Sequence, residues 1–368
     1  MPQTGEGSQL KELTSALIGT GAIARSLHLP AHRRLTGSLL KWVCNTSAQS
    51  ARSAAEEFGV PLWTVRLEDV LNDSSVDWVD VAVPNEHHEA VTIRCLEAGK
   101  HVLCQKPMAP TVEATERMTA AAERAGRQLG IYMCFRGDPA VRLIRDLVRQ
   151  GRFGKLISLR GKMISDKGLQ LQPGQWRMEG ASGALDLLGV HLIDLFSWIY
   201  SEIEWAQAYS ATLHAPMKGD DVTTAVYGLS GGVTAVLETT YCSYLNEHTP
   251  LYTLEVNGTD GTAVYVMDHG RLSLQLKEDY RSDSFTYQAG TWNSYKFEHA
   301  LWGGGSLPQV HQDFVHALLA GKPFDIGGDA GSRAIRVVEA RRKSQIRCRR
   351  VRPYREKASG CGPRQVLD

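Results

Sequence analysis

A glycine-rich stretch near the N-terminus has the residue types and spacing that bind a pyrophosphate. The apolar run at residues 16–18 stops at Gly19 and Gly21 and then resumes, which predicts a strand, a tight turn and a helix. In the matching G-x-G-x-x-G/A pattern the first glycine permits the turn and the second lets a phosphate approach the backbone. Ala24 would let helix and strand pack closely, and the helix N-terminus offers free N–H groups. The stretch predicts a dinucleotide site, with an ordinary strand-to-helix turn as the alternative.

The residues after the next strand bear on which dinucleotide would bind. Residues 39–44 form an apolar run that predicts the second strand. The position that reads the adenosine ribose lies about 20 residues beyond the glycine turn. Asn45, Thr46 and Ser47 occupy it here. None is a carboxylate that would accept from a ribose 2′-OH or repel a 2′-phosphate, so both NAD and NADP stay open.

Two side chains could exchange a proton with a substrate. Interconversion of a secondary alcohol and a ketone needs a nicotinamide for the hydride and a group that takes or gives the hydroxyl proton. Lys106 follows the apolar run at residues 101–104, where desolvation would lower its pKa, and Pro107 restricts it to extended conformations. His191 titrates near neutral pH without special help. The alternatives are a solvated lysine and a histidine satisfied in the core.

Strands and helices alternate through about the first 135 residues. This alternation predicts an α/β fold with a doubly wound parallel sheet, whose sites lie at the carboxyl ends of the strands. Gly19, Asn45, Pro84 and Lys106 would then meet at one edge of the sheet. The predicted strands are 16–18, 39–44, 76–83, 101–104 and 129–135, and the predicted helices are 48–58, 67–71, 88–98 and 111–125.

The pattern changes near residue 155 to a series of strands in hairpin spacing. They predict a second, α+β domain on an open, mostly antiparallel sheet, with one helix at 183–200 and two near 310–320 and 331–344. Residues 279–305 have a mixed composition that favours loops. We therefore expect a dinucleotide-binding domain at 1–135, a substrate-binding and oligomerisation domain at 136–345, and a basic, disordered tail at 346–368. The predicted strands are 156–163, 205–213, 223–229, 234–241, 252–256, 262–267 and 271–276.

Bulk composition narrows the class of protein. The chain has 368 residues, 43% of them hydrophobic and 22% charged, as in globular proteins of about two domains. No apolar run approaches the ~18–20 residues of a membrane span, and residues 1–12 lack the apolar core of a signal peptide, so we expect a cytoplasmic protein. The seven cysteines form no C-x-x-C pair and sit mostly in apolar runs, which predicts buried thiols. No metal-ligand spacing is present, and no metal is expected.

Charge is divided unevenly along the chain. Residues 341–368 carry ten basic and two acidic side chains, or +8, and the other 340 residues carry 31 basic and 38 acidic ones, or −7. A basic tail can contact nucleic acid or an anionic surface. Its glycines, prolines and weak apolar periodicity favour a solvated end instead, so a nucleic-acid partner is not expected.

Several motifs together resemble the Gfo/Idh/MocA family of NAD(P)-dependent oxidoreductases, whose members act mostly on sugars and cyclitols. The similarity runs to about residue 344 and includes Arg136 and Pro139 near the domain junction. The motifs are GTGAIA at 19–24, PNEHH at 84–88, AGKHVLCQKP at 98–107, GALDLLGVHLID at 183–194 and the closing region 313–340.

The chain departs from the family pattern at two places. Where the family has Glu-Lys-Pro, this chain has Gln105 before its lysine, which removes a charge nearby. The family helix carries Asp four residues before its His, whereas here Leu187 holds that position and the acid is Asp186. In a regular helix, positions five apart lie ~140° apart, so Asp186 would face away from His191, whereas Asp194, three residues on, lies ~60° away and could orient it. A bulge near Gly189 would rescue Asp186, but the sequence indicates none.

The resemblance implies an NAD(P)-dependent dehydrogenase or reductase for a hydroxyl or ketone of a sugar, cyclitol or activated sugar, working as a homodimer or homotetramer. Two alternatives stay open: a catalytically weakened regulator or partner subunit, and an enzyme using a transient hydride step for elimination, epimerisation or glycoside cleavage. Lys106 and His191 are the expected catalytic residues, with Asp186 and Asp194 as further candidates. Expected cofactor contacts are Gly19, Gly21, Ala22, Ile23, Ala24, Asn45, Thr46, Ser47, Pro84, Asn85, His88, Gln105 and Lys106, and expected substrate contacts are Asp166, Trp176, Arg177 and His191.

Overall fold

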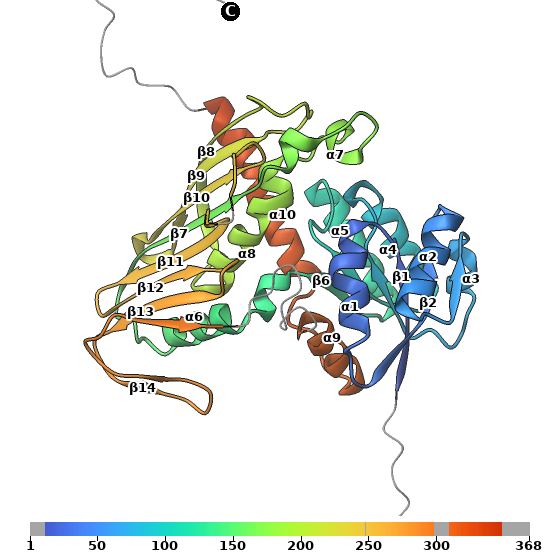
Figure 1. Ribbon diagram of the computed structural model, residues 1–368, viewed down its shortest axis with the longest axis horizontal. Coiled ribbons are helices and arrows are strands. Elements are labelled where there is room, and N and C mark those ends of the chain that lie inside the picture. Colours follow the sequence, from blue (N-terminus) through green and yellow to red (C-terminus); the bar gives the residue numbers. More distant parts are fainter. Residues whose placement is uncertain (1–11, 247, 298–308, 348–368) are drawn as a thin grey trace, which may run out of the picture.

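A computed structural model describes residues 12–246, 248–297 and 309–347 (Figure 1). It contains a six-stranded sheet and an eight-stranded sheet, each with its own helices, so the expected α/β fold with a second, mostly antiparallel sheet is confirmed. From residue 348 on, the basic tail expected at 346–368 lies outside the described residues. No helix in the described ranges is both long and apolar enough to cross a membrane.

The first sheet is parallel, with the strand order β3-β2-β1-β4-β5-β6. Its central strands are buried almost throughout, because helices cover both faces. Ser47 caps the start of helix α2, its side chain accepting from the Ser50 N–H, and Gly59 in the left-handed conformation caps the end. The strands are β1 (Leu13–Ile18), β2 (Ser38–Cys44), β3 (Leu62–Thr64), β4 (Trp78–Val81), β5 (His101–Gln105) and β6 (Leu129–Tyr132). The helices are α1 (Leu29–His32), α2 (Ala48–Phe58), α3 (Leu67–Leu71), α4 (His88–Glu97) and α5 (Val112–Ala125).

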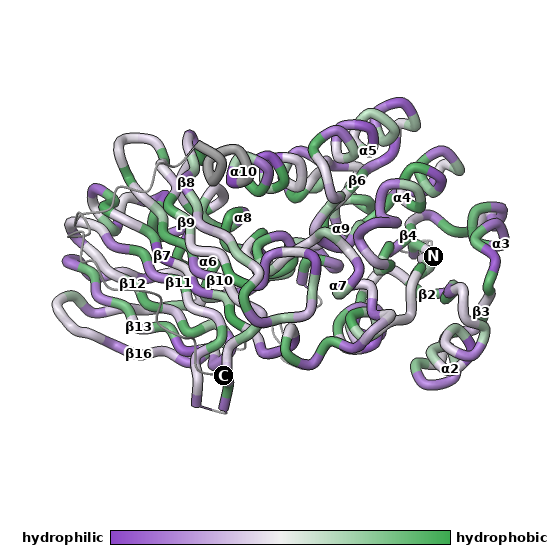
Figure 2. The backbone as a smooth tube through the Cα atoms, turned by 90° about the horizontal axis from the view of Figure 1, so that it is seen from above, coloured by the Kyte–Doolittle hydropathy of each residue, from purple (hydrophilic) through white to green (hydrophobic). Residues whose placement is uncertain are grey.

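The second sheet has the order β16-β13-β12-β11-β7-β10-β9-β8, and only the β7–β10 pair within it is parallel. Hydropathy alternates along its strands, as expected for a sheet with unlike faces (Figure 2). Its strands are β7 (Leu156–Ile164), β8 (Ile203–Ala211), β9 (Val222–Leu229), β10 (Thr234–Thr240), β11 (Tyr252–Gly258), β12 (Gly261–Val266), β13 (Arg271–Leu276) and β16 (Asn293–Lys296). The remaining helices are α6 (Pro139–Arg149), α7 (Trp176–Glu179), α8 (Val190–Ile199), α9 (Gln309–Leu319) and α10 (Gly328–Arg347).

The sequence did not predict β3 of the first sheet or α7, and two further segments beyond residue 135 also differ from the sequence-based expectation. The region expected to hold loops contains the hairpin β14 (Tyr280–Arg281) and β15 (Thr286–Tyr287), and β16, which pairs with β13 at the sheet edge. These strands are too short for an apolar alternation to reveal them. Helix α6 was also not expected; the Asp138 carboxylate caps it by accepting from the N–H groups of Ala140 and Val141.

The end of the described chain returns to the first sheet. Phe314 of α9 packs edge-on against Trp78, with ring centroids 5.5 Å apart. The Ile131 N–H then donates to the Ile326 carbonyl at 2.8 Å, beside β6. This return places His311 against the buried carboxylate of Asp80, although 231 residues separate the two.

Candidate active site

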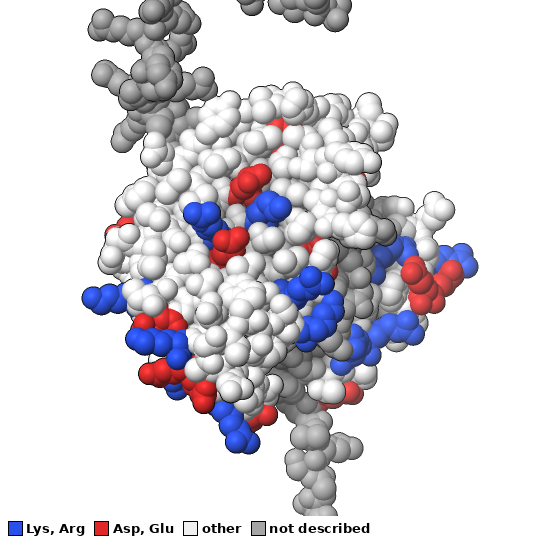
Figure 3. Space-filling model, turned by 60° about the vertical axis from the view of Figure 1, so that its left-hand side comes forward, with Lys and Arg blue, Asp and Glu red and all other residues white. Residues whose placement is uncertain are grey.

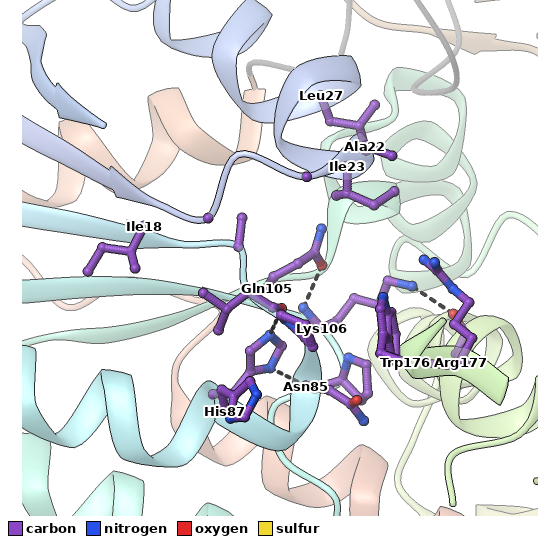
Figure 4. A pocket seen from close by; sticks show the side chains of 18 of the residues that line it. Ile18, Ala22, Ile23, Leu27, Asn85, His87, Gln105, Lys106, Trp176 and Arg177 are labelled. Atoms are coloured by element: carbon purple, nitrogen blue, oxygen red, sulfur yellow. Dashed lines mark hydrogen bonds between the residues drawn. The ribbon is translucent and has the colours of Figure 1, made fainter. Parts of the chain in front are cut away.

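A cavity of about 740 Å³ lies where the carboxyl ends of the parallel strands face β7, β10 and the start of α8 (Figure 4). This size is typical of small-molecule sites. Eleven of the thirteen expected cofactor contacts line it, all except Ala24 and Ser47. Ala24 is buried in the core, and Ser47 caps α2. His87 lies exposed at the rim.

The glycine turn has the shape that a pyrophosphate requires. Gly19 has φ of +100°, and a Cβ there would meet the Ala82 carbonyl oxygen at 2.4 Å, so the turn packs tightly on the strand beside it. A Cβ on Gly21 would find nothing within 4 Å, so this glycine borders open space. A tight turn beside open space at the start of a helix fits a bound dinucleotide.

At the ribose end, the side chain of Asn45 is held by the protein. Its amide donates to the Thr20 hydroxyl at 2.7 Å, and its oxygen accepts from the Ser47 N–H at 2.9 Å. Asn45 and Thr46 line the cavity. This end therefore presents small polar groups without a carboxylate.

Lys106 lies at the end of β5 and reaches across the cavity (Figure 4). Its ammonium donates to the backbone carbonyl of Leu187 at 2.7 Å. Burial lowers the pKa of Lys106 to about 8; Cys134 opposes this shift, and the positive charges of Arg177 and Lys167 add to it. A lysine with this pKa can both accept and donate a proton near neutral pH.

His191 faces the same end of the cavity from α8. The side chain is only 5% exposed, and its ring meets the Phe135 ring edge-on at 4.8 Å. Burial, and then the charge of Lys106, hold the pKa of His191 well below its usual value, so the imidazole is neutral. Its Nδ1 atom is buried and has no hydrogen-bond partner among the described residues.

Two residues of the 84–88 motif form hydrogen-bonding contacts between segments that line the cavity. His88 lies with one ring nitrogen 2.8 Å from the Pro107 carbonyl and the other 2.9 Å from the Val83 carbonyl, which ties the ends of β4 and β5 together. Burial lowers its pKa to about 4. Asn85 donates to the Ser182 hydroxyl at 2.8 Å. This bond connects the segment after β4 to the segment before the π-helical turn at Leu185–Gly189. The contacts of His88 therefore give it a structural role, which is to hold the segments after β4 and β5 together.

Comparison with known proteins matches both parts of the chain to one family. Residues 13–133 match the model described as "Oxidoreductase family, NAD-binding Rossmann fold", and residues 141–264 match the GFO/IDH/MocA C-terminal domain. The 1,5-anhydro-D-fructose reductase of Ensifer adhaerens is 32% identical over 255 residues, 67% of this chain and 74% of that protein. The chain belongs to the Gfo/Idh/MocA family. It is an oxidoreductase with an NAD-binding Rossmann domain.

Other relatives extend over more of the chain. The D-apiose dehydrogenase of Paraburkholderia graminis is 26% identical over 333 residues, 90% of this chain and 87% of that protein. The structure of a levoglucosan dehydrogenase in complex with NADH and levoglucosan superposes with a TM-score of 0.79 at 24% identity, covering 91% of this chain and 98% of that one. This structural likeness shows a shared fold over nearly the whole length.

The family's usual acid is absent from the cavity of this member. The helix is not regular, because Leu185–Gly189 form a π-helical turn before α8, an irregularity that the sequence did not indicate. Asp186 nevertheless points away from the cavity: its carboxylate accepts from the Gly183 N–H at 3.0 Å and lies 3.7 Å from Arg341. A backbone carbonyl, that of Leu187, takes the place beside Lys106.

The suggestion that Asp194 orients His191 is wrong. Its two carboxylate oxygens accept from the Arg136 guanidinium at 2.8 and 2.5 Å in a buried, bidentate pair. This pairing satisfies Asp194 away from the imidazole. The helical angle between the two residues was small, but a stronger partner on another element decides where the carboxylate points.

Gln105, the second departure from the family, connects Lys106 to a buried histidine cluster. Its amide oxygen accepts from the Lys106 backbone N–H at 2.5 Å, so its NH₂ group must face His28 Nε2, 3.1 Å away. This nitrogen of His28 therefore accepts, and the ring proton sits on Nδ1, which donates to Asp80 at 2.8 Å.

Three histidines surround the same Asp80 oxygen. His32 and His311 approach it at 3.1 and 2.9 Å, besides His28. Burial alone would raise the pKa of Asp80, but the interactions with His28 and His311 outweigh it and hold the pKa well below the usual value. His28, Asp80 and His311 are close enough to share a metal ion. The proton that Gln105 fixes on His28 Nδ1 leaves that nitrogen no lone pair for one, so we interpret the cluster as hydrogen-bonded.

The substrate end of the cavity includes residues that sequence reasoning missed. Trp176 and Arg177 line it as expected, whereas Asp166 does not: its carboxylate accepts from the Gln170 side chain at 2.7 Å. Two of the missed residues follow β6 of the first sheet, and the others lie at or near the ends of β7, β10 and β11 of the second sheet. No local signal marks which of these strand ends meet at the cavity. The missed residues are Cys134, Phe135, Met163, Ser165, Lys167, Tyr241 and Tyr252.

Proposed function

We propose that this chain is an NAD(P)-dependent dehydrogenase or reductase that interconverts a secondary hydroxyl and a ketone on a sugar or cyclitol. The observation that carries the proposal is Lys106, whose pKa of about 8 and position across the cavity from the glycine turn suit proton exchange at a reacting carbon. Relatives named D-apiose, levoglucosan and inositol dehydrogenases support the substrate class.

In the oxidation direction, neutral Lys106 accepts the hydroxyl proton while the C–H hydrogen leaves with its electron pair. The bound nicotinamide supplies the acceptor for that hydride, and the products are a ketone and the Lys106 ammonium. In the reduction direction the Lys106 ammonium returns the proton to the carbonyl oxygen. The Leu187 carbonyl orients the amine, and neutral His191 hydrogen-bonds the substrate oxygen.

We further propose that the enzyme accepts both NAD and NADP. The cavity residues at the ribose end include Asn45 and Thr46 and no carboxylate among those described. A 2′-phosphate therefore meets no fixed negative charge. We expect the two reduced cofactors to bind within about 100-fold of each other, or about 2.7 kcal/mol.

The test is a screen of sugars and cyclitols for turnover, followed at the nicotinamide absorbance. Lys106→Met should abolish the activity found and leave NADH binding intact, because the lysine moves a proton and does not hold the pyrophosphate. Lys155→Met, at an exposed lysine outside the cavity, is the matched control and should behave as wild type. Equal activity of the two variants would contradict the proposal.

The same screen separates the alternatives. Since a backbone carbonyl replaces the family's acid beside Lys106, a weakened, regulatory member is the second candidate. It predicts NADH binding with no turnover of any compound. An enzyme that uses a transient hydride step predicts substrate consumption without a net change in nicotinamide absorbance, which product analysis would detect.

A further inference from the structure

The charged side chains among the described residues that line the cavity are all positive. Its described lining includes Arg94, Lys106, Lys167 and Arg177, and not one Asp or Glu. Arg94 pairs with Glu68 at 2.5 Å, at the edge far from the reacting end. The other three cations lie together at the substrate end: the charges of Arg177 and Lys167 are close enough to lower the pKa of Lys106.

Arg177 is held in place with hydrogen-bonding capacity to spare. Its guanidinium stacks 4.3 Å from the centre of the Trp176 ring and hydrogen-bonds the Tyr241 side chain. Its Nε atom is buried and has no partner in the described part of the chain. Figure 4 shows Trp176 and Arg177 reaching from α7 towards Lys106. A fixed guanidinium with open donors is the group that proteins use to bind a carboxylate or a phosphate.

The nearest carboxylates are engaged elsewhere. Asp186 accepts from Gly183 and faces Arg341, and Glu179 pairs with Lys218 at 3.1 Å. Asp166 is close enough to act on Lys167 but accepts from Gln170 and does not line the cavity. The pyrophosphate of the cofactor is accounted for at the glycine turn, on the opposite wall. The buried, unpartnered Nε of Arg177 therefore calls for an acceptor on the substrate, which a carboxylate or a phosphate supplies.

We propose that the substrate is an anionic sugar, whose carboxylate or phosphate binds Arg177 with Lys167 beside it while the reacting carbon faces Lys106. This inference rests on the proposed function and narrows its substrate class. A neutral sugar would offer the buried Nε donor of Arg177 no charged acceptor, whereas an anion supplies charge-assisted hydrogen bonds.

The experiment compares matched substrates that differ in one group: glucose with glucuronate and glucose 6-phosphate, and galactose with galacturonate and galactose 6-phosphate. Within at least one set, we expect kcat/KM for an anionic member to exceed that of its neutral partner by about 100-fold, the scale of a charge-assisted bidentate contact. Comparison of the uronates with the sugar phosphates shows whether the site prefers a carboxylate or a phosphate. Equal or better turnover of the neutral sugars would overturn the inference and leave the proposed function standing.

Arg177→Met tests the residue. We expect it to lower kcat/KM for the preferred anion by about 100-fold, to lower the ratio of anionic to neutral kcat/KM accordingly, and to leave NADH affinity unchanged. Arg177→Lys should retain part of the preference, and Arg33→Met, at an exposed arginine far from the cavity, should retain all of it. A loss of NADH affinity with unchanged discrimination would assign Arg177 to the cofactor and overturn the inference.

If no compound is turned over, that result counts against the proposed function. A direct binding measurement then tests whether the site prefers an anion. Calorimetric titration of the same six compounds into the enzyme–NADH complex should show heat for uronates or phosphates, and Arg177→Met should abolish it. Binding of neutral sugars alone, or of none of the six, would overturn the inference. Melting temperatures of the variants within a degree or two of wild type would establish that they fold.

Discussion

At the residue scale, Lys106 carries the proton chemistry without a carboxylate beside it. Its pKa of about 8 predicts the pH dependence of turnover. In oxidation the amine must be neutral, so kcat/KM should rise with pH through an apparent pKa near 8, and in reduction it should fall through the same value. Rates measured across this range with a saturating cofactor provide the check. A flat profile in both directions would contradict Lys106 as the proton carrier.

Removal of the amine should be costly in rate. Lys106→Ala is expected to lower kcat/KM by about 10²–10⁴-fold, the usual worth of a general acid or base, with nucleotide binding retained. His191→Ala should lose a comparable or smaller factor, because the neutral imidazole positions the substrate oxygen. The residual activity of Lys106→Ala should no longer change with pH near pH 8. A pH dependence that persists there would mean that a different group transfers the proton.

Gln105 contacts both the Lys106 backbone and His28 of the buried histidine cluster, so a substitution there should change the pKa of Lys106 and the stability of the fold. In Gln105→Glu, a carboxylate would raise the pKa of Lys106, and the profile should shift to higher pH. It would also face His28 Nε2, a nitrogen that accepts, so the melting temperature should fall. Gln105→Met is the control, because it removes the same hydrogen bonds without adding charge and should lower stability with no upward shift. A profile that stays in place in Gln105→Glu would contradict the argument.

At the element scale, the π-helical turn Leu185–Gly189 decides which group faces Lys106. It presents the Leu187 carbonyl to the ammonium and leaves Asp186 against the Gly183 N–H. Asp186→Asn keeps an oxygen for that N–H and should lower kcat/KM by less than about 10-fold. Steady-state kinetics beside Lys106→Ala make the comparison. A loss as large as that of Lys106→Ala would mean that Asp186 turns into the cavity during the reaction.

The strand–turn–helix at the N-terminus predicts opposite outcomes for its two glycines. A side chain on Gly21 enters open space, so Gly21→Val should fold normally and lose NADH binding by more than about 100-fold. A Cβ on Gly19 collides with the Ala82 carbonyl, so Gly19→Ala should lower the melting temperature. Fluorescence titration with NADH and thermal melting separate the two. Unchanged NADH affinity in Gly21→Val would place the pyrophosphate elsewhere.

The sequence predicted the elements that have strong local signals and missed those that depend on distant partners. The parallel strands are rich in apolar residues and alternate with helices, and this order along the chain brought Gly19 and Lys106 to one edge. A π-helical turn has no comparable signal, and neither has the approach of His311 to Asp80 across 231 residues. Asp194 was misassigned because helical angles say nothing of Arg136 on another element. The lining of the substrate end was missed for the same reason.

At the scale of the whole molecule, the chain covers the apolar face of its second sheet with its own helices. Leu192 of α8 packs directly on Gly161 of β7, and α10 packs against β8 (Figure 1). A partner subunit is therefore not needed to bury this apolar face. The other face of the sheet is the one open to a partner.

The open face combines aromatic and aliphatic side chains with a small set of paired charges. By register, Lys162 lies beside Glu238 and Arg160 beside Glu255, all on the face that also carries Tyr209. Figure 3, which brings this side of the molecule forward, shows a largely uncharged surface with charges of both signs close together. Such a surface can pair with its own copy about a two-fold axis, since each charge can meet an opposite one.

We therefore expect a dimer, or a tetramer of closed symmetry, joined through this face, with a mass by light scattering of at least twice the 40.5 kDa of one chain. Tyr209 is 47% exposed there, so Tyr209→Glu would bury an unpaired charge in the interface and should shift the mass towards the monomer. Leu39→Glu is the matched control, because Leu39 is 59% exposed but lies on β2 of the first sheet. A monomeric wild type, or equal dissociation by both variants, would contradict assembly through the second sheet. If Tyr209→Glu is monomeric and still turns over substrate at the wild-type rate, the cavity is complete within one chain.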